Sequence, residues 1–360
     1  MLTNETKYIS FSPWWGGWNN QRMSYETAAA ISVVTGRKLI LPYKEYCLFF
    51  GWHERKREFL DFWRILDKEA FTSQFDCVDF FDVEEYAHLG NDVHYYHGIE
   101  NVANCITFQG QEYNDWGHNI DPSWNEIMVD SVVDYKHFDY FRNGRDVIEL
   151  NVPDKFIHFG RNLFAHYYYH VYGPTQRVRN TIKAKMRDGI RFRREYYGLA
   201  KKALRELGTY NALHVRVNDF KNTHEYETNE MINNLQAKLE GRVSKDMPLY
   251  IATDEQDKSV FQPMRENYNI YFLDDFYDFL DDYEALALDH IIPANAEIFL
   301  GSKFSTFTDG INCFRGFAGK RDFCREGINF NYGPLDPNTL PWRQEQYAWH
   351  HQYDTHWKFE

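Results

Sequence analysis

The sequence predicts an α/β fold in which parallel sheets carry helices on both faces. Strand-like and helix-like runs alternate along the chain, which is the pattern of parallel strands joined by crossover helices. The chain also opens with a strand, a helix and a second strand, the βαβ unit of such folds. Because 360 residues is long for one hydrophobic core, we expect two domains.

The first half begins clearly and then loses its pattern. Its predicted elements are a strand at 7–11, a helix at 20–35, strands at 38–41 and 156–159, and one long basic helix over about 175–206. Gly36 ends the first helix, because glycine readily adopts the left-handed conformation of a helix C-cap. Residues from about 44 to 150 are rich in aromatic residues, His and Asp, and show only weak periodicity.

The second half alternates more regularly. Its predicted elements are strands at 212–217, 249–253, 270–273 and 298–300, with helices near 227–240, 255–267 and 282–295. The change of pattern places the domain boundary within about 175–210. We expect a first domain over 1–205, a second over 206–325, and a tail, 326–360, that packs back on the first domain.

Composition and charge exclude several functions. Hydrophobic residues make up 43% of the chain, which is ample for a globular core. A formal net charge of -13 opposes binding to a polyanion, so nucleic acid is not an expected partner, and an anionic small ligand needs a local basic patch. The five cysteines are odd in number and include no Cys-x-x-Cys, which argues against a zinc site and a complete disulfide framework.

The sequence shows no targeting or membrane signal. No basic segment followed by an apolar run occurs at the N-terminus, and no stretch approaches the roughly 20 apolar residues of a membrane helix. We therefore expect a soluble or cytoplasmic protein without a membrane partner.

Three segments place polar groups or open backbone amides at the ends of predicted strands, where ligands bind in open α/β sheets. The first is Gly16-Gly17-Trp18-Asn19-Asn20-Gln21-Arg22, between the first strand and the first helix. Glycines let a ligand approach the backbone, and a helix N-terminus attracts anions. In this interpretation Asn19 or Asn20 caps the helix or binds the ligand, and Arg22 reaches a phosphate or an Asp. The alternative is a plain tight turn with an Asn cap.

The second segment spans 212–220. His214 and Arg216 alternate with apolar residues and so share one face of the strand, which is unusual because parallel strands are normally buried on both sides. Arg216 offers a planar fork for diphosphate oxygens, and His214 can donate to a phosphate or orient a substrate. The alternative is a buried Arg paired with a structural carboxylate such as Asp219 or Asp254.

The third segment, 298–308, runs from a strand into a helix. Hydroxyls at Ser302, Ser305, Thr306 and Thr308 could join the helix N-terminus in a phosphate seat. The alternative is simple N-capping by Ser305 or Thr306. In the preceding helix, Asp289 could accept the N1–H and 2-amino hydrogens of guanine, or be an ordinary solvated carboxylate.

Two absences bear on cofactors. The chain contains neither a Gly-x-x-x-x-Gly-Lys-Ser/Thr phosphate loop nor an Asp-x-Asp pair, the usual anchor for a metal-bound diphosphate. The pairs His94/His97 and His166/His170 lack an evident third ligand, so we interpret them as surface or aromatic-cluster histidines. We expect no metal and no other cofactor.

Together these motifs resemble the GDP-fucose protein O-fucosyltransferase family. The matching positions are the first segment and 35–42, His214 and Arg216 with Asp219 and Phe220, 251–254, Asp289, 299–301, 305–308 and Arg315. The resemblance implies a GT-B fold, in which two Rossmann-like domains face a central cleft. The second domain mainly holds the donor, and the first lies on the acceptor side.

The resemblance also implies an inverting, metal-independent transfer of fucose from GDP-fucose to a hydroxyl of a protein or glycan. Carried over by position, it gives catalytic roles to Arg216, Asn19 and Asn20, and donor contacts to Gly16, Gly17, Trp18, His214, Val215, Asp289, Ser305, Thr306 and Phe307. Within this set His214 and Arg216 would hold the diphosphate. Asp289 would meet guanine.

The chain departs from the family pattern in two ways. Some members carry a Glu general base where Gly16 stands here, and eukaryotic relatives act in the secretory pathway, whereas no secretory signal is seen. Two alternatives therefore stay open: a glycan or small-molecule acceptor, and a non-catalytic GDP-sugar- or glycan-binding protein with the same fold. Turnover of GDP-fucose would separate the enzyme from the binding protein.

Overall fold

The computed structural model describes residues 6–13, 17–43, 45–50, 56–89, 104–106, 155–159, 163, 176–217, 228–302 and 305–318. The chain divides into two compact units, with the change from one to the other between Arg191 and Phe192. The predicted tail, 326–360, lies outside the described residues.

A parallel five-stranded sheet forms the centre of the first unit. Its strand order is β5-β2-β1-β7-β6. The strands are β1 (Tyr8–Phe11), β2 (Lys38–Leu41), β5 (Cys77–Asp79), β6 (Asn104–Ile106) and β7 (Phe156–Phe159). The predicted strands at 7–11, 38–41 and 156–159 are therefore confirmed.

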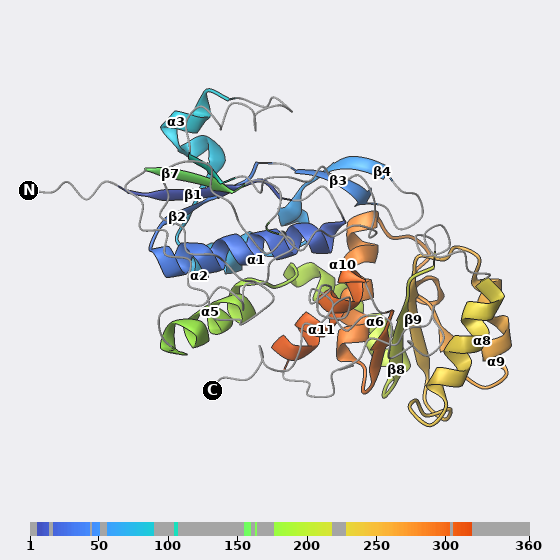
Figure 1. The fold of residues 1–360 in the computed structure, drawn as a ribbon. Coiled ribbons are helices and arrows are strands. Elements are labelled where there is room, and N and C mark those ends of the chain that lie inside the picture. Colours follow the sequence, from blue (N-terminus) through green and yellow to red (C-terminus); the bar gives the residue numbers. More distant parts are fainter. Residues whose placement is uncertain are drawn as a thin grey trace, which may run out of the picture. The chain divides into compact units, whose positions relative to one another are not determined.

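Helix α1 (Trp18–Thr35) completes the predicted βαβ opening and lies along β1 and β2 (Figure 1). It begins two residues before the predicted start, because Gly17 rather than an Asn is its N-cap. Gly36 ends it with a φ of 66°, in the left-handed region that glycine favours. Consecutive buried alanines on α1, 28–30, allow a close approach to the sheet.

The remaining elements of this half are short. They are a two-stranded sheet of β3 (Glu45–Phe50) and β4 (Lys56–Leu60), the 3₁₀ turns η1 (Phe62–Arg64) and η2 (Phe80–Asp82), and helices α2 (Lys68–Gln74), α3 (Glu84–Ala87) and α5 (Gln176–Gly189). Elements of three to seven residues give little periodicity, which explains why the pattern fades after residue 44.

The single long helix predicted over 175–206 is wrong. The chain forms two helices, α5 and α6 (Arg194–Leu207), because α5 ends at Gly189 and the residues between them are extended. Ile190 and Phe192 are buried there, and the Arg191 carbonyl accepts a hydrogen bond from the Asp67 amide. The burial of this connecting segment stabilises a break between the two helices, where the run of basic residues predicted one continuous helix.

The second unit contains a parallel four-stranded sheet in the order β10-β9-β8-β11. Its strands are β8 (Asn211–Val215), β9 (Leu249–Thr253), β10 (Ile270–Tyr271) and β11 (Phe299–Gly301). Helices α6, α10 (Asp282–Asn295) and α11 (Thr306–Phe317) lie on one face, and α8 (Thr228–Leu239) and α9 (Gln262–Arg265) on the other (Figure 1). Short turns η6 (Lys258–Phe261) and η7 (Leu273–Asp275) complete the unit. The predicted doubly covered parallel sheet is confirmed.

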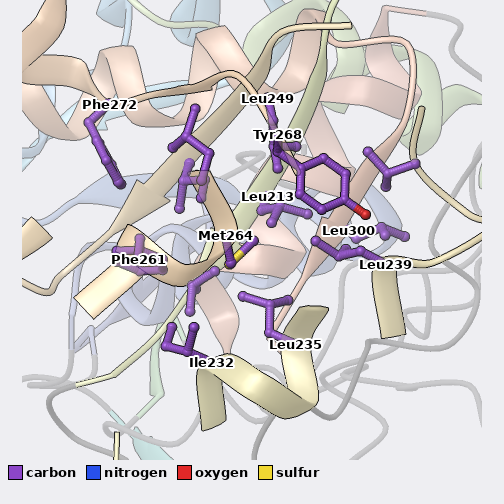
Figure 2. Close-up of a cluster of buried hydrophobic side chains, with 14 of the residues drawn as sticks. Leu213, Ile232, Leu235, Leu239, Leu249, Phe261, Met264, Tyr268, Phe272 and Leu300 are labelled. Atoms are coloured by element: carbon purple, nitrogen blue, oxygen red, sulfur yellow. The ribbon is translucent and has the colours of Figure 1, made fainter. Parts of the chain in front are cut away.

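The alternation of side chains along the strands decides what each face of this sheet contacts. Figure 2 shows the core beneath α8 and α9, where Leu213 and Leu249 pack with apolar residues of both helices. Val215 lies in the same core and is fully buried. The intervening residues, including His214 and Tyr250, therefore face α10 and α11.

Candidate functional site

The strand order of the second unit reverses beside β8. From β8 the chain moves to β9 and β10 on one side, and then returns to β11 on the other. Such a topological switch point leaves a crevice at the carboxyl ends of the strands, where ligands bind in open α/β sheets. Three polar side chains follow the ends of adjacent strands here: Arg216 after β8, Ser302 after β11 and Asp254 after β9.

Ser302 ties β8 to β11 beyond the last residues of both strands. Its backbone N–H donates to the His214 carbonyl at 2.9 Å, and its Oγ accepts from the Arg216 backbone N–H at 2.9 Å. The Ser302 hydroxyl lies 3.2 Å from the same His214 carbonyl, to which it donates. These bonds fix the backbone that carries the two predicted ligand residues.

His214 lies buried behind this edge. Its Nδ1 is 2.8 Å from the Thr308 hydroxyl, and the same hydroxyl donates to the Ser302 carbonyl at 3.0 Å. Burial, and next the positive charge of Arg216, hold the His214 pKa well below its usual range, so the ring is neutral at neutral pH. Thr308 joins the predicted site as the residue that contacts His214.

Gly301 makes the approach of α11 to β11 possible. A Cβ atom at this position would lie 2.2 Å from Thr308 Cγ2 and 2.6 Å from Thr308 Oγ1, far inside van der Waals contact. Glycine is therefore required here by close packing.

Arg216 pairs with Asp254, as the alternative interpretation expects. Its Nε lies 3.4 Å from Asp254 Oδ2, and the other carboxylate oxygen, Oδ1, accepts from the Val217 backbone N–H at 2.7 Å. The Arg216 side chain is nevertheless 25% exposed, so the guanidinium is held by Asp254 without being buried by it. Asp219, the other carboxylate considered for this pairing, lies outside the described residues.

Helix α11 points its N-terminus at the same sheet edge. Ser305 is its N-cap by backbone position, but the Ser305 side chain makes no capping hydrogen bond, so capping by that hydroxyl is wrong. Thr306 is the first helical residue and is half-buried. The first turn of a helix offers N–H groups that lack intrahelical acceptors, together with the positive end of the helix dipole.

Phe307 packs between two imidazole rings. Its ring stacks on His214 at a centroid distance of 4.6 Å and an angle of 18°, and lies 3.9 Å from the ring of His290. His290 is fully buried and its Nδ1 lies 2.7 Å from the Leu286 carbonyl. His290 was not singled out by the sequence, because one His in an apolar helix carries no motif.

Asp289 is fully buried rather than a solvated helix carboxylate. Its Oδ1 accepts a hydrogen bond from the Tyr250 hydroxyl, and its Oδ2 has no hydrogen-bond partner among the described residues. Burial raises the pKa of Asp289 from its ordinary value to about 8, although the Tyr250 hydrogen bond lowers it.

The first unit holds the glycine-rich segment, of which Gly16 lies outside the described residues. Gly17 precedes α1, and Asn19 and Asn20 stand inside the helix, so neither Asn caps it. The Trp18 ring is buried and stacks near Phe62 at 6.2 Å. The Asn20 side chain is half-buried, and its Oδ1 has no partner among the described residues.

Arg22 is buried inside α1 instead of reaching out to a phosphate. It forms an ion pair with Glu26, one turn further along, and both side chains are essentially inaccessible. Its Nε also donates to the Asn19 Oδ1 at 3.2 Å. Burial raises the pKa of Glu26, against the opposing effect of Arg22. The Arg22–Glu26 pair therefore orients Asn19 from within the helix.

A buried polar network lies at the end of β1 and was not predicted from the sequence. His158 on β7 lies between Ser10 and Ser12, at 2.9 Å from Nδ1 and 3.0 Å from Nε2, and Ser10 also lies 3.2 Å from the Tyr86 hydroxyl. The signal was the polar residues at alternate positions of apolar strands. Because Ser12 leads towards Gly17, this network anchors the strand that enters the glycine-rich segment.

Metal ligands do not gather in the described parts of either unit: no group of three His, Cys, Asp or Glu residues is placed to hold an ion there. The histidines at 94, 97, 166 and 170 lie outside those parts. Among the described helices, none has the length and apolar character needed to cross a membrane.

The comparison with protein families identifies the chain. The model of the GDP-fucose protein O-fucosyltransferase family matches residues 8–318, which is most of the sequence. The chain belongs to this family. The match confirms the resemblance that the motifs of this fucosyltransferase indicated. GDP-fucose is the donor of its family's reaction.

Solved structures of two fucosyltransferases are similar to this chain. POFUT1 in complex with GDP is 16% identical with a TM-score of 0.51, over 88% of this chain and 97% of that one. POFUT1 in complex with GDP-fucose is 18% identical with a TM-score of 0.52, again over 88% and 97%. The fucosyltransferase NodZ from Bradyrhizobium is 9% identical with a TM-score of 0.45, over 85% and 92%. The POFUT1 likeness confirms the predicted GT-B-like α/β fold class. Comparison with curated protein sequences found no match.

Proposed function

We propose that this fucosyltransferase transfers fucose from GDP-fucose to a hydroxyl acceptor with inversion at the anomeric carbon and without a metal ion. The observation that supports this most is the grouping of Arg216, His214 and the N-terminus of α11 at the switch point of the second sheet. A diphosphate requires positive charge and directed N–H donors, and this edge offers both.

Arg216 is the proposed centre of charge stabilisation. As the bond between fucose and GDP breaks, negative charge accumulates on the departing diphosphate. A guanidinium already oriented by Asp254 needs little reorganisation to stabilise that charge. The fork of N–H groups also matches the geometry of phosphate oxygens. The dipole of α11 adds to this charge stabilisation. Because the Ser305 side chain makes no capping hydrogen bond, the first N–H groups of the helix are left for other acceptors.

This arrangement makes a metal unnecessary in the proposed reaction. A guanidinium and a helix N-terminus together supply the positive field that a divalent cation supplies to diphosphates elsewhere. The POFUT1 complexes with GDP and GDP-fucose share this fold, which favours GDP-fucose as the ligand of the same edge here. Thr306, Phe307 and Asp289 are proposed to lie on the nucleotide side of it.

The first unit is proposed to serve the acceptor side. Gly17 to Asn20 precede and open α1 at the carboxyl end of β1, where the strand order of the first sheet also reverses. The Arg22–Glu26 pair orients Asn19. The amide oxygen of Asn20 is buried and has no hydrogen-bond partner among the described residues, and we propose that it accepts a hydroxyl hydrogen of the acceptor. The acceptor is proposed to be a hydroxyl of protein Ser/Thr or of a glycan.

Substitution of Arg216 by Lys tests the proposal. Lysine keeps the charge but loses the fork, so kcat for GDP-fucose turnover should fall about a hundredfold, on the order of 3 kcal/mol, while the protein stays folded. Arg205→Lys is the matched control, because Arg205 is exposed on α6 and its Nε bonds only a backbone carbonyl of its own helix. Turnover near the wild-type rate in a folded Arg216→Lys protein would remove Arg216 from the mechanism. A protein that binds GDP but never releases fucose from GDP-fucose would be a binding module instead.

A further inference from the structure

The hydroxyl of Thr308 faces two hydrogen-bonding groups but carries one hydrogen. It lies 3.0 Å from the Ser302 carbonyl oxygen and 2.8 Å from Nδ1 of His214. A carbonyl oxygen can only accept, so the Thr308 hydrogen satisfies Ser302. The lone pairs of the hydroxyl oxygen then face His214, and the contact is satisfied only when Nδ1 carries the hydrogen.

This count fixes the tautomer of His214. The ring is buried, and both burial and the nearby charge of Arg216 disfavour its protonated form. In a neutral imidazole with hydrogen on Nδ1, the second nitrogen, Nε2, has a lone pair and no hydrogen. No described residue provides a hydrogen-bond partner for Nε2.

The packing around the ring prevents it from escaping this arrangement. Phe307 stacks on one face of the imidazole, and the close contact of Gly301 with Thr308 sets the position of the hydroxyl. Ser302, which receives the Thr308 hydrogen, is itself held by the His214 backbone. The hydrogen bonds that link Ser302, Thr308 and His214 are therefore held in place by the backbone at one end and by ring stacking at the other.

We propose that Thr308 is a positioning residue that holds His214 as a neutral hydrogen-bond acceptor, so that Nε2 accepts a hydroxyl hydrogen of the nucleotide sugar instead of donating to the diphosphate. This inference rests on the proposed function, and it revises the role that the family resemblance gives to His214. Recognition of phosphate charge is then left to Arg216 and α11. Nε2 selects for a ligand that presents a hydroxyl beside the diphosphate.

Nitrogen NMR of the ¹⁵N-histidine-labelled protein tests the positioning step without any substrate. The His214 signals are assigned by their loss in a His214→Gln variant. We expect the ligand-free wild type to show a protonated Nδ1 and a bare Nε2. Thr308→Val keeps the shape but removes the acceptor, so His214 should switch its hydrogen to Nε2, whereas Thr308→Ser should keep the wild-type tautomer. The matched control is Thr181→Val, which removes an exposed hydroxyl bonded to its own helix.

A hydrogen on Nε2 in the ligand-free wild type, or the same tautomer in Thr308→Val as in the wild type, would overturn the assignment of Thr308. Thermal melting shows whether each variant is folded. If Thr308→Val does not fold, the wild-type spectrum and that of Thr308→Ser still decide the tautomer.

The acceptor step is tested with GDP-fucose at saturation. We expect Nε2 to stay unprotonated and its signal to shift as it accepts a hydrogen bond. We also expect kcat/KM for GDP-fucose to fall about tenfold in Thr308→Val, the loss of roughly one good hydrogen bond, and to recover in Thr308→Ser. Conversion of His214 to imidazolium on binding would show donation to the diphosphate and overturn this step. Failure of GDP-fucose to bind at all would refute the proposed function, and the ligand-free spectrum would still decide the role of Thr308.

Discussion

Asp289→Asn should change how the stability of the second unit depends on pH. Burial raises the pKa of Asp289 to about 8, whereas an unfolded chain leaves an Asp near 3.8. The neutral acid is therefore the form that the fold prefers. Its contribution to stability is complete below about pH 4 and is lost as the pH rises towards 8, because between these pH values the folded state must keep a proton that the unfolded state has already released.

The size of the effect follows from the difference between the two pKa values. Each pH unit between them costs the wild type about 1.4 kcal/mol, which amounts to about 4 kcal/mol between pH 5 and pH 8. Asparagine cannot ionise, and its carbonyl oxygen can still accept from Tyr250. Its amide nitrogen replaces an oxygen that has no partner among the described residues, so the variant should lose about 1–3 kcal/mol at pH 5. By pH 8 it should equal or exceed the wild type.

Urea unfolding followed by circular dichroism measures the free energy of unfolding of both proteins at pH 5 and pH 8. The quantity to compare is the difference between the variant and the wild type at each pH. With an m-value of about 2 kcal/mol/M, the midpoint of the variant relative to the wild type should move by about 2 M between the two pH values. Asp246→Asn, at an exposed position, controls for the removal of one negative charge. Parallel pH profiles for wild type and Asp289→Asn would show that Asp289 is ionised in the fold, and would refute the reasoning.

Four further outcomes are expected. Gly301→Ala should destabilise the protein by about 1–3 kcal/mol, since the new Cβ collides with Thr308; an unchanged melting temperature would contradict the packing. Glu26→Gln should cost about 3–5 kcal/mol by removing the carboxylate that balances the buried charge of Arg22, and replacement of both residues by apolar ones should recover much of that stability; equal losses of stability in the single and double variants would argue that the ion pair does not stabilise the fold. Calorimetry should detect GDP binding in excess chelator, whereas loss of binding on chelation would end the metal-free proposal. Asp289→Ala should weaken GDP binding and narrow the preference for GDP over ADP; unchanged discrimination would leave Asp289 with a purely structural role.

The strands were predictable because each carries its own pattern. The strand at 249–253 is a mostly apolar run between Pro248 and Asp254, and its observed limits match the prediction. The alternation of His214 with Leu213 and Val215 likewise predicted which face each residue takes. The long helix failed because the extended connection at Ile190 to Phe192 is stabilised by tertiary burial, which local periodicity does not report.

The sequence predicted which residues of the candidate site lie near one another, but not the contacts that they make. The sequence indicated His214, Arg216 and the segment after β11 as neighbours, since the carboxyl ends of parallel strands meet at one edge. It did not indicate that Thr308 bonds His214 or that Tyr250 bonds Asp289, because each of these pairs is distant in sequence and comes together through packing of a helix on the sheet. For the same reason it could not show that Trp18 buries its side chain in the core of the first unit.

The contact between Gly301 and Thr308 also limits how this edge can change through mutation. A larger residue at 301 is accommodated only by a smaller one at 308, and every smaller replacement except serine removes the hydroxyl that His214 uses. Serine at 308 keeps the hydroxyl, but Oγ1 and Cβ of residue 308 would still lie 2.6 and 2.9 Å from a Cβ at 301, so serine does not remove the collision. The two positions therefore constrain each other. A directed-evolution library aimed at new nucleotide sugars should keep this pair constant and randomise positions that do not share its packing.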